Sequence, residues 1–194
     1  MNIYQILAVA TSLTLLSCNE SGRGNDSNLN EDQNEAADES NTSKFAGKMQ
    51  RDAEFVFDVI ASNYGEIKLA ELANQRSRTE QVKKIAQKLL AEHTASLNEL
   101  KTLAQAKAIS VPVEEPDASK RKLEDIAEES GEDFDKQWVS EMLDLHEKSI
   151  DGFEKRLDDT EDEELRAFIT KTLPVLKEHR EHLETFEKSL EKKV

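Results

Sequence analysis

Basic residues are few relative to acidic ones in this sequence of 194 residues, and this shortage excludes some classes of binding partner. Lys and Arg number 26 against 41 Asp and Glu, which gives a formal net charge of -15. Nucleic acids and anionic lipid headgroups are bound through basic surfaces, so neither is expected as a partner of this chain. The hydrophobic share of 37% is also too low for a body embedded in a membrane.

Turn-forming residues and cysteines are equally few. Six Gly and three Pro leave little to interrupt helices, so a mostly helical chain is expected. A single cysteine excludes an intrachain disulfide framework. The sequence has no cysteine pair, no Gly-rich phosphate loop and no nucleophile paired with a base. Hydrolysis and thiol redox exchange are therefore not expected, and no catalytic residue is assigned.

The N-terminal apolar segment is too short to span a membrane. The run from Ile3 to Leu16 carries no charge but falls short of the roughly 20 residues that a spanning helix needs. It predicts a signal peptide over residues 1–17. The sequence Leu15-Leu16-Ser17-Cys18 resembles the bacterial lipobox, in which the cysteine becomes the lipidated first residue. The alternative is an ordinary secretory signal in which Cys18 is incidental.

The stretch that follows is strongly polar. From residue 18 to 44 it is rich in Asn, Ser, Asp and Glu, with Leu29 as the only large aliphatic residue. Such a composition buries too little apolar surface to offset chain entropy, so a flexible acidic tether is predicted. Asn19, in place of Asp after the cysteine, favours the outer membrane over the inner one by analogy with bacterial sorting rules. We therefore expect a lipid-anchored cell-envelope protein that faces the periplasm.

Residues 45–194 carry the pattern of a helical domain. Apolar residues recur at three- and four-residue steps and predict helices over about 47–75, 77–107, 131–158 and 161–191. The long connection over 108–130 fits the crossover of a ferritin-like four-helix bundle, and part of it is expected to form a short helix. The fold class is therefore all-α. A plain up-and-down bundle is the alternative topology.

Each predicted helix interrupts its apolar stripe once with a polar residue. These four residues are Glu66, His93, His146 and His179. At about 1.5 Å of rise per residue, all four fall at similar heights in an antiparallel bundle. They are therefore expected to meet in one layer. His182, one turn beyond His179, either joins this layer or faces water.

Such a layer has two interpretations. A buried imidazole without a partner costs on the order of 2 to 7 kcal/mol, so its hydrogen bonds must be satisfied. One solution is a hydrogen-bonded layer completed by Asn63 or Tyr64 and water. The other is a metal, because three imidazoles and one carboxylate form a complete set for zinc or a partial one for iron or manganese.

Acidic residues beside the histidines are expected to take no part. Glu92, Glu147 and Glu178 each point about 100° away from the histidine stripe, which is typical of a solvated helix face. A di-iron carboxylate site is disfavoured too, because it needs Glu-x-x-His on two helices. Leucines stand three residues before the three stripe histidines.

These same segments resemble a known bacterial family. The stretches Ala61-Ser62-Asn63-Tyr64-Gly65-Glu66-Ile67-Lys68-Leu69-Ala70, Leu89 to His93, Phe134-Asp135 with His146, and Leu173-Pro174-Val175-Leu176-Lys177-Glu178-His179 resemble the domain of unknown function 4142. The resemblance covers roughly residues 45–190 and implies a ferritin-like fold in an exported protein, but no reaction. The family usually has Tyr where Trp138 stands.

Three functions remain open at this level. The first is an envelope-anchored binding or stress-related module without enzymatic activity, with or without a metal in its His/Glu layer. The second is a metal-dependent oxidoreductase or a metal store. The third is a structural bundle for protein partners, which the sequence does not identify.

Overall fold

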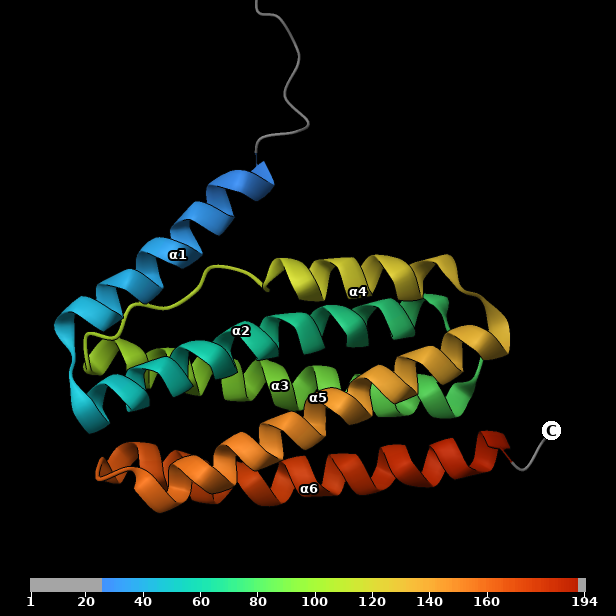
Figure 1. The fold of residues 1–194 in the computed structure, drawn as a ribbon. Helices are drawn as coiled ribbons and strands as arrows, with labels where there is room; N and C mark the ends of the chain where they lie inside the picture. The colour runs from blue at the N-terminus through green and yellow to red at the C-terminus, as the bar shows by residue number, and fades with distance from the viewer. Residues whose placement is uncertain (1–25, 192–194) are drawn as a thin grey trace, which may run out of the picture.

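The computed structural model describes residues 26–191, and this part of the chain consists of helices and their connections, without strands (Figure 1). The all-α prediction is confirmed. The helices are α1 (Asp26–Lys44), α2 (Gly47–Arg76), α3 (Glu80–Ala106), α4 (Asp117–Glu128), α5 (Gly131–Asp159) and α6 (Glu163–Glu191). The signal peptide and Cys18 lie outside the described residues. Within residues 26–191, none of the helices combines the length and the apolar character that a membrane span requires.

Four long helices form two antiparallel pairs, α2 with α3 and α5 with α6, joined by a crossover that contains α4 (Figure 1). Contacts at the two ends fix the directions. The Ser77 Oγ hydroxyl, just before α3, donates to Asp135 Oδ1 near the start of α5 at 2.7 Å. At the other end, Lys107 Nζ donates to Glu164 Oε2 at 2.8 Å. Helices α3 and α5 therefore run parallel, as a long crossover requires, and not antiparallel as in an up-and-down bundle.

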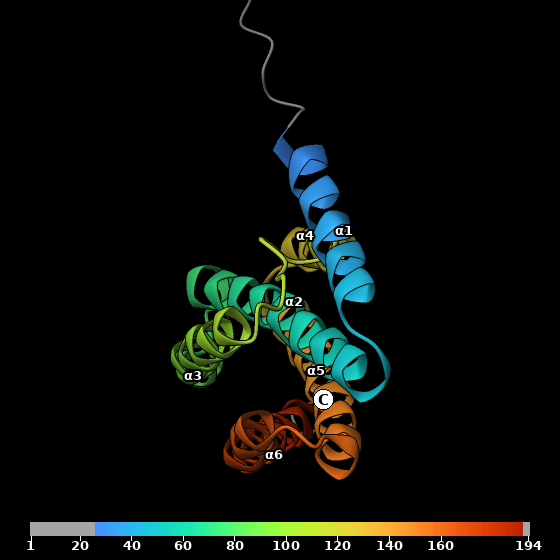
Figure 2. The same cartoon turned by 90° about the vertical axis from the view of Figure 1, so that its left-hand side faces the viewer.

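The helix that carries the crossover lies directly on α2. A Cβ added at Gly65 would come within 3.2 Å of the Ser119 side chain of α4, so glycine permits this close approach. Viewed along the bundle, α1 and α4 lie on the α2 side of the molecule and α6 lies on the opposite side (Figure 2).

The apolar core is divided into two clusters by the polar layer. One cluster contains Trp138, Phe134 and Leu183, and the other contains Phe153 and Ile60. Each of the four long helices contributes to both clusters, with its polar stripe residue between them. The layer therefore sits in the middle of the bundle, enclosed by apolar residues on both sides along its axis.

The flexible tether predicted over residues 18–44 is corrected over residues 26–44, which form α1. Buried Asn41 holds this helix to the crossover, because its Oδ1 accepts from Ser110 N at 2.8 Å and its Nδ2 donates to Ser110 O at 2.7 Å. Asn34 Oδ1 accepts from Val113 N at 2.8 Å. Amide side chains dock this helix on the crossover, and a composition poor in apolar residues gives no sign of such contacts. Residues 18–25 are outside the described part.

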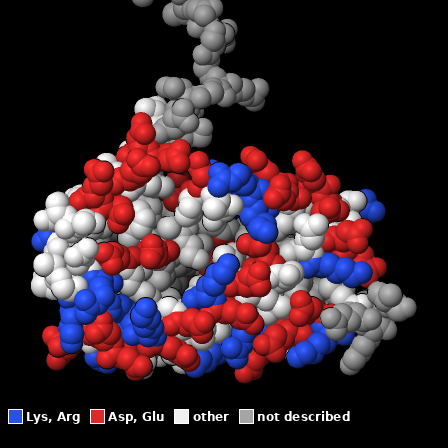
Figure 3. All heavy atoms as spheres, in the orientation of Figure 1, with Lys and Arg blue, Asp and Glu red and all other residues white. Residues whose placement is uncertain are grey.

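The face of the molecule drawn in Figure 3 carries acidic and basic side chains in alternation, with acidic residues gathered along the edge formed by α1. No continuous basic surface appears on this face. This distribution agrees with the acidic composition and offers no phosphate-binding surface on the side shown.

Candidate metal centre

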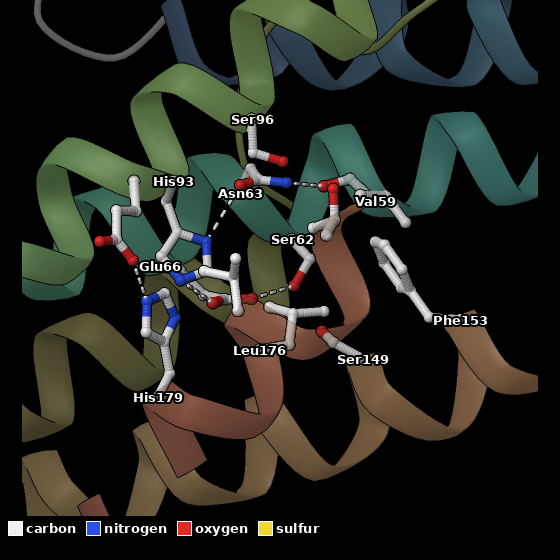
Figure 4. Close-up of a pocket in the computed structure, with 13 residues that line it drawn as sticks. Val59, Ser62, Asn63, Glu66, His93, Ser96, Ser149, Phe153, Leu176 and His179 are labelled. Carbon is white, nitrogen blue, oxygen red and sulfur yellow. Dashed lines mark hydrogen bonds and ion pairs between the residues drawn. The ribbon is translucent and has the colours of Figure 1, made fainter. Parts of the chain in front are cut away.

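The four polar stripe residues lie together in the bundle interior. Glu66, His93, His146 and His179 come from α2, α3, α5 and α6, and each is between 0 and 4% exposed. Figure 4 shows Glu66, His93 and His179 converging from three helices. The expectation that the stripe residues meet in one layer therefore agrees with the structure.

The inward nitrogens of the three imidazoles stand at the spacing of metal ligands. His93 Nε2 lies 3.4 Å from His146 Nε2, and His146 Nε2 lies 3.2 Å from His179 Nδ1. The ligand atoms of all three residues fall within 4.8 Å of one another. Tetrahedral zinc with bonds of about 2.0 to 2.1 Å places its ligand atoms about 3.3 to 3.4 Å apart. The triangle is thus the right size for one ion.

Each imidazole uses its other nitrogen in a hydrogen bond that points away from the triangle. His93 Nδ1 donates to Asn63 Oδ1 at 3.0 Å, and the Asn63 amide is oriented by its own bond from Nδ2 to Val59 O at 2.8 Å. His146 Nδ1 donates to Met142 O at 2.8 Å.

The third imidazole is held by a carboxylate. His179 Nε2 donates to Glu92. Because a neutral imidazole has one N–H, and the outward acceptors take it in all three rings, the inward nitrogens are lone pairs. Outward partners of this kind hold the ring orientation and tautomer of metal-binding histidines.

Glu66 brings a negative charge to the same place. Its Oε1 accepts from Ser62 Oγ at 2.8 Å. Its Oε2 lies 3.1 Å from His93 Nε2 and 3.9 Å from His146 Nδ1, yet this buried oxygen has no hydrogen-bond donor. A buried carboxylate oxygen without a donor carries a large desolvation cost. A cation among the four residues would remove that cost.

Burial and charge set the protonation of the layer. Burial lowers the pKa of His93 below its ordinary value, against the opposing effect of Glu66. Burial also lowers the pKa of His179 to about 4. Burial alone would raise the pKa of Glu66, but attraction to the protonated forms of His93 and His146, together with the Ser62 hydrogen bond, lowers it. Neutral imidazoles and an ionised carboxylate are the forms that bind metals.

Two residues considered in the sequence lie outside the layer. His182 is exposed on the surface of α6, where it borders a surface hollow together with His179. The Tyr64 hydroxyl accepts from Lys101 Nζ at 2.6 Å instead of from the layer.

Glu92 is the functional residue that the sequence interpretation missed. It was expected on a solvated face, but its carboxylate accepts the His179 N–H, with its side chain 38% exposed. Position 92 lies on the side of α3 that faces α6, which a one-helix analysis cannot identify. Glu178, by contrast, pairs with Lys88 at the surface, as expected of a solvated residue.

A small cavity adjoins the layer. It has a volume of about 30 Å³ and is bounded by residues of all four long helices, including Glu66, His93 and His179 (Figure 4). Its polar lining is completed by the hydroxyl residues Ser62, Ser96, Ser149 and Thr172.

The sequence of this chain matches one known protein family. The family described as Domain of unknown function (DUF4142) matches residues 34–186. The chain belongs to this family. The matched region of this DUF4142 protein begins within α1 and contains all four residues of the layer together with Glu92. No curated protein and no solved structure matches the chain.

Proposed function

We propose that this DUF4142 protein is a metal-binding helical bundle of the cell envelope. One divalent ion is held by His93 Nε2, His146 Nε2 and His179 Nδ1, with Glu66 as the fourth ligand. The observation that carries the proposal is the convergence of three imidazole lone pairs, all within 4.8 Å of one another, beside a buried carboxylate oxygen that lies 3.1 Å from His93 Nε2 and has no donor.

The same observation weighs against the hydrogen-bonded layer. In that layer, contacts of 3.2 and 3.4 Å between imidazole nitrogens would each need an N–H at one end. The N–H groups are instead used by Asn63, Met142 and Glu92. Supplying an inward proton would require a charged imidazole, and burial opposes this at His93 and His179.

The ligand set fits some metals better than others. Three imidazoles and one carboxylate suit four-coordinate zinc, and they suit iron or manganese with positions left for small ligands. The site therefore suits the binding of a single ion. The crossover topology supports a ferritin-like arrangement of the helices around it. A metal store would need space for many ions, whereas the cavity beside the layer measures about 30 Å³.

The test is metal stoichiometry. Purified protein, stripped with a chelator, is titrated with Zn²⁺, Mn²⁺ and Fe²⁺, and bound metal is measured by elemental analysis. We expect one ion per chain for the wild type and for His182→Ala, a matched control on the same helix. His179→Ala should lose most of the bound ion. Equal metal content in the wild type and His179→Ala would contradict the proposal.

The other two functional classes are separated by further measurements. Sustained turnover of peroxide or oxygen by protein loaded with iron or manganese would make it an oxidoreductase instead of a binding module. Absence of any bound metal, together with a protein that binds the bundle surface reproducibly, would favour the structural role.

The envelope location rests on the lipobox and is tested separately. Cys18→Ser should release the protein into soluble fractions or leave an unprocessed precursor, and fatty-acid labelling of the wild type should mark the chain. A wild-type protein without acyl chains, beginning at a residue other than Cys18, would show that the anchor is absent.

A further inference from the structure

We infer that the cavity beside the layer binds a small ligand of two or three heavy atoms that coordinates the metal through oxygen or nitrogen. Peroxide and dioxygen belong to this class. The inference rests on the proposed metal site, because the ligand would take a coordination position that the protein leaves open. The cavity is thus a second binding site, which the four metal-binding residues by themselves do not specify.

The size of the cavity selects the ligand class. A volume of about 30 Å³ exceeds the 10 to 15 Å³ or so that one water requires. It accommodates one or two waters or a linear ligand of two or three atoms, and it excludes sugars, nucleotides and amino acids. Because Glu66, His93 and His179 form part of its wall, a ligand there lies next to the metal.

The chemistry of the wall fits a polar ligand. Hydroxyl groups from all four long helices line the cavity, one each from Ser62, Ser96, Ser149 and Thr172. Each hydroxyl can donate and accept. Ser62 donates to Glu66, but Figure 4 draws no hydrogen bond from Ser96 or Ser149 to another lining residue. Val59, Phe153 and Leu176 supply an apolar floor.

Access comes from the seam between α3 and α6. Two surface hollows lie along this seam, of about 300 Å³ beside Lys88 and His182 and of about 510 Å³ beside Glu99 and Lys171. His179 lines both the cavity and the first hollow. Ion pairs bridge this seam, including Lys171 to Glu99 at 2.6 Å. Exposed ion pairs contribute little stability, so they leave the seam able to admit a small solute.

The test uses Co²⁺ as the metal and azide as the ligand. The visible absorption of Co²⁺-loaded protein should change on addition of azide and saturate. Ser96→Leu and Thr172→Leu fill the cavity from two different helices and should weaken azide binding at least tenfold, while one Co²⁺ per chain remains bound. Thr94→Leu and Thr170→Leu are matched controls at exposed positions of α3 and α6, and should leave azide binding unchanged.

The outcomes separate this inference from the metal proposal. Full Co²⁺ binding without an azide-dependent change would overturn the cavity site alone, as would equal azide affinity in the wild type and in both Leu variants that bind Co²⁺. Failure of the wild type to bind Co²⁺ and the other divalent ions would overturn the metal proposal and this inference together. Circular dichroism of each variant confirms that the helices are intact.

Discussion

Two buried polar groups in this bundle differ in how their donors and acceptors are matched. Near the start of α5, Asp135 is buried, and its two oxygens accept from the hydroxyls of Ser77 and Thr79. In the central layer, three imidazole lone pairs face one another, and the Glu66 oxygen that lies 3.1 Å from His93 Nε2 has no donor. The first group is complete with protein atoms alone. The second leaves a buried carboxylate oxygen without a donor, and this difference is the reason why a metal is proposed in the layer and not beside Asp135.

The largest expected effect is the loss of metal on removing a central ligand. His146→Ala should weaken metal binding at least 100-fold, because it removes one of four ligands and leaves a void. Chelation of the wild type should lower its melting temperature, since an ion at 100 times its Kd stabilises the folded state by about 2.7 kcal/mol. Competition titration and thermal unfolding measure these two effects. Unchanged metal affinity in His146→Ala would show that the layer does not bind the metal, and the proposed difference between the layer and the Asp135 group would then be wrong.

Acid should destabilise the metal-free protein through the layer. The folded pKa of His93 and of His179 is lowered, so the unfolded chain takes up protons first as pH falls below about 6.5. Stability is therefore complete above this pH and is lost towards pH 4, by on the order of 3 kcal/mol for His179. Urea unfolding between pH 7 and 4 provides the measurement. The loss should be smaller in His179→Ala, and an identical pH profile would count against the assignment.

The Asp135 group should respond in the opposite way to the layer. Asp135→Ala leaves the hydroxyls of Ser77 and Thr79 without their acceptor, which should cost about 1 to 3 kcal/mol of stability. Metal affinity should stay at the wild-type value. Chemical unfolding and metal titration of the same preparation test both statements. Loss of metal in this variant, with the helices intact, would show that the two groups are coupled.

The smallest expected effect concerns the outer partner of His179. Glu92→Gln retains an acceptor but loses the negative charge, so metal affinity should fall about tenfold, at the lower end of the range for such partners. Glu178→Gln, which changes an exposed acid on α6, is the control and should leave affinity unchanged. Equal metal affinities in Glu92→Gln and Glu178→Gln would mean that the Glu92 carboxylate does not contribute to metal binding through His179.

The helices and the composition of the layer could be predicted from the sequence. Helical periodicity is local, so the apolar stripes and their interruptions at Glu66, His93, His146 and His179 could be identified one helix at a time. Because the rise per residue of a helix is constant, these four residues could also be predicted to lie at a similar height along the bundle axis. The predicted bounds of 77–107 and 131–158 lie within a few residues of Glu80–Ala106 and Gly131–Asp159.

The tertiary structure decided the hydrogen-bond partners of the layer, which the sequence left open. The sequence allowed both a hydrogen-bonded layer and a metal, because the direction of each imidazole N–H depends on an acceptor such as Asn63 or Glu92. The docking of Asn41 on Ser110 likewise joins residues far apart in the chain. Periodicity reports which face of a helix is buried, but the partners of a polar atom are set by rotamers and by neighbouring helices. Only the assembled bundle therefore shows three imidazole lone pairs within 4.8 Å of one another, the arrangement on which the metal proposal rests.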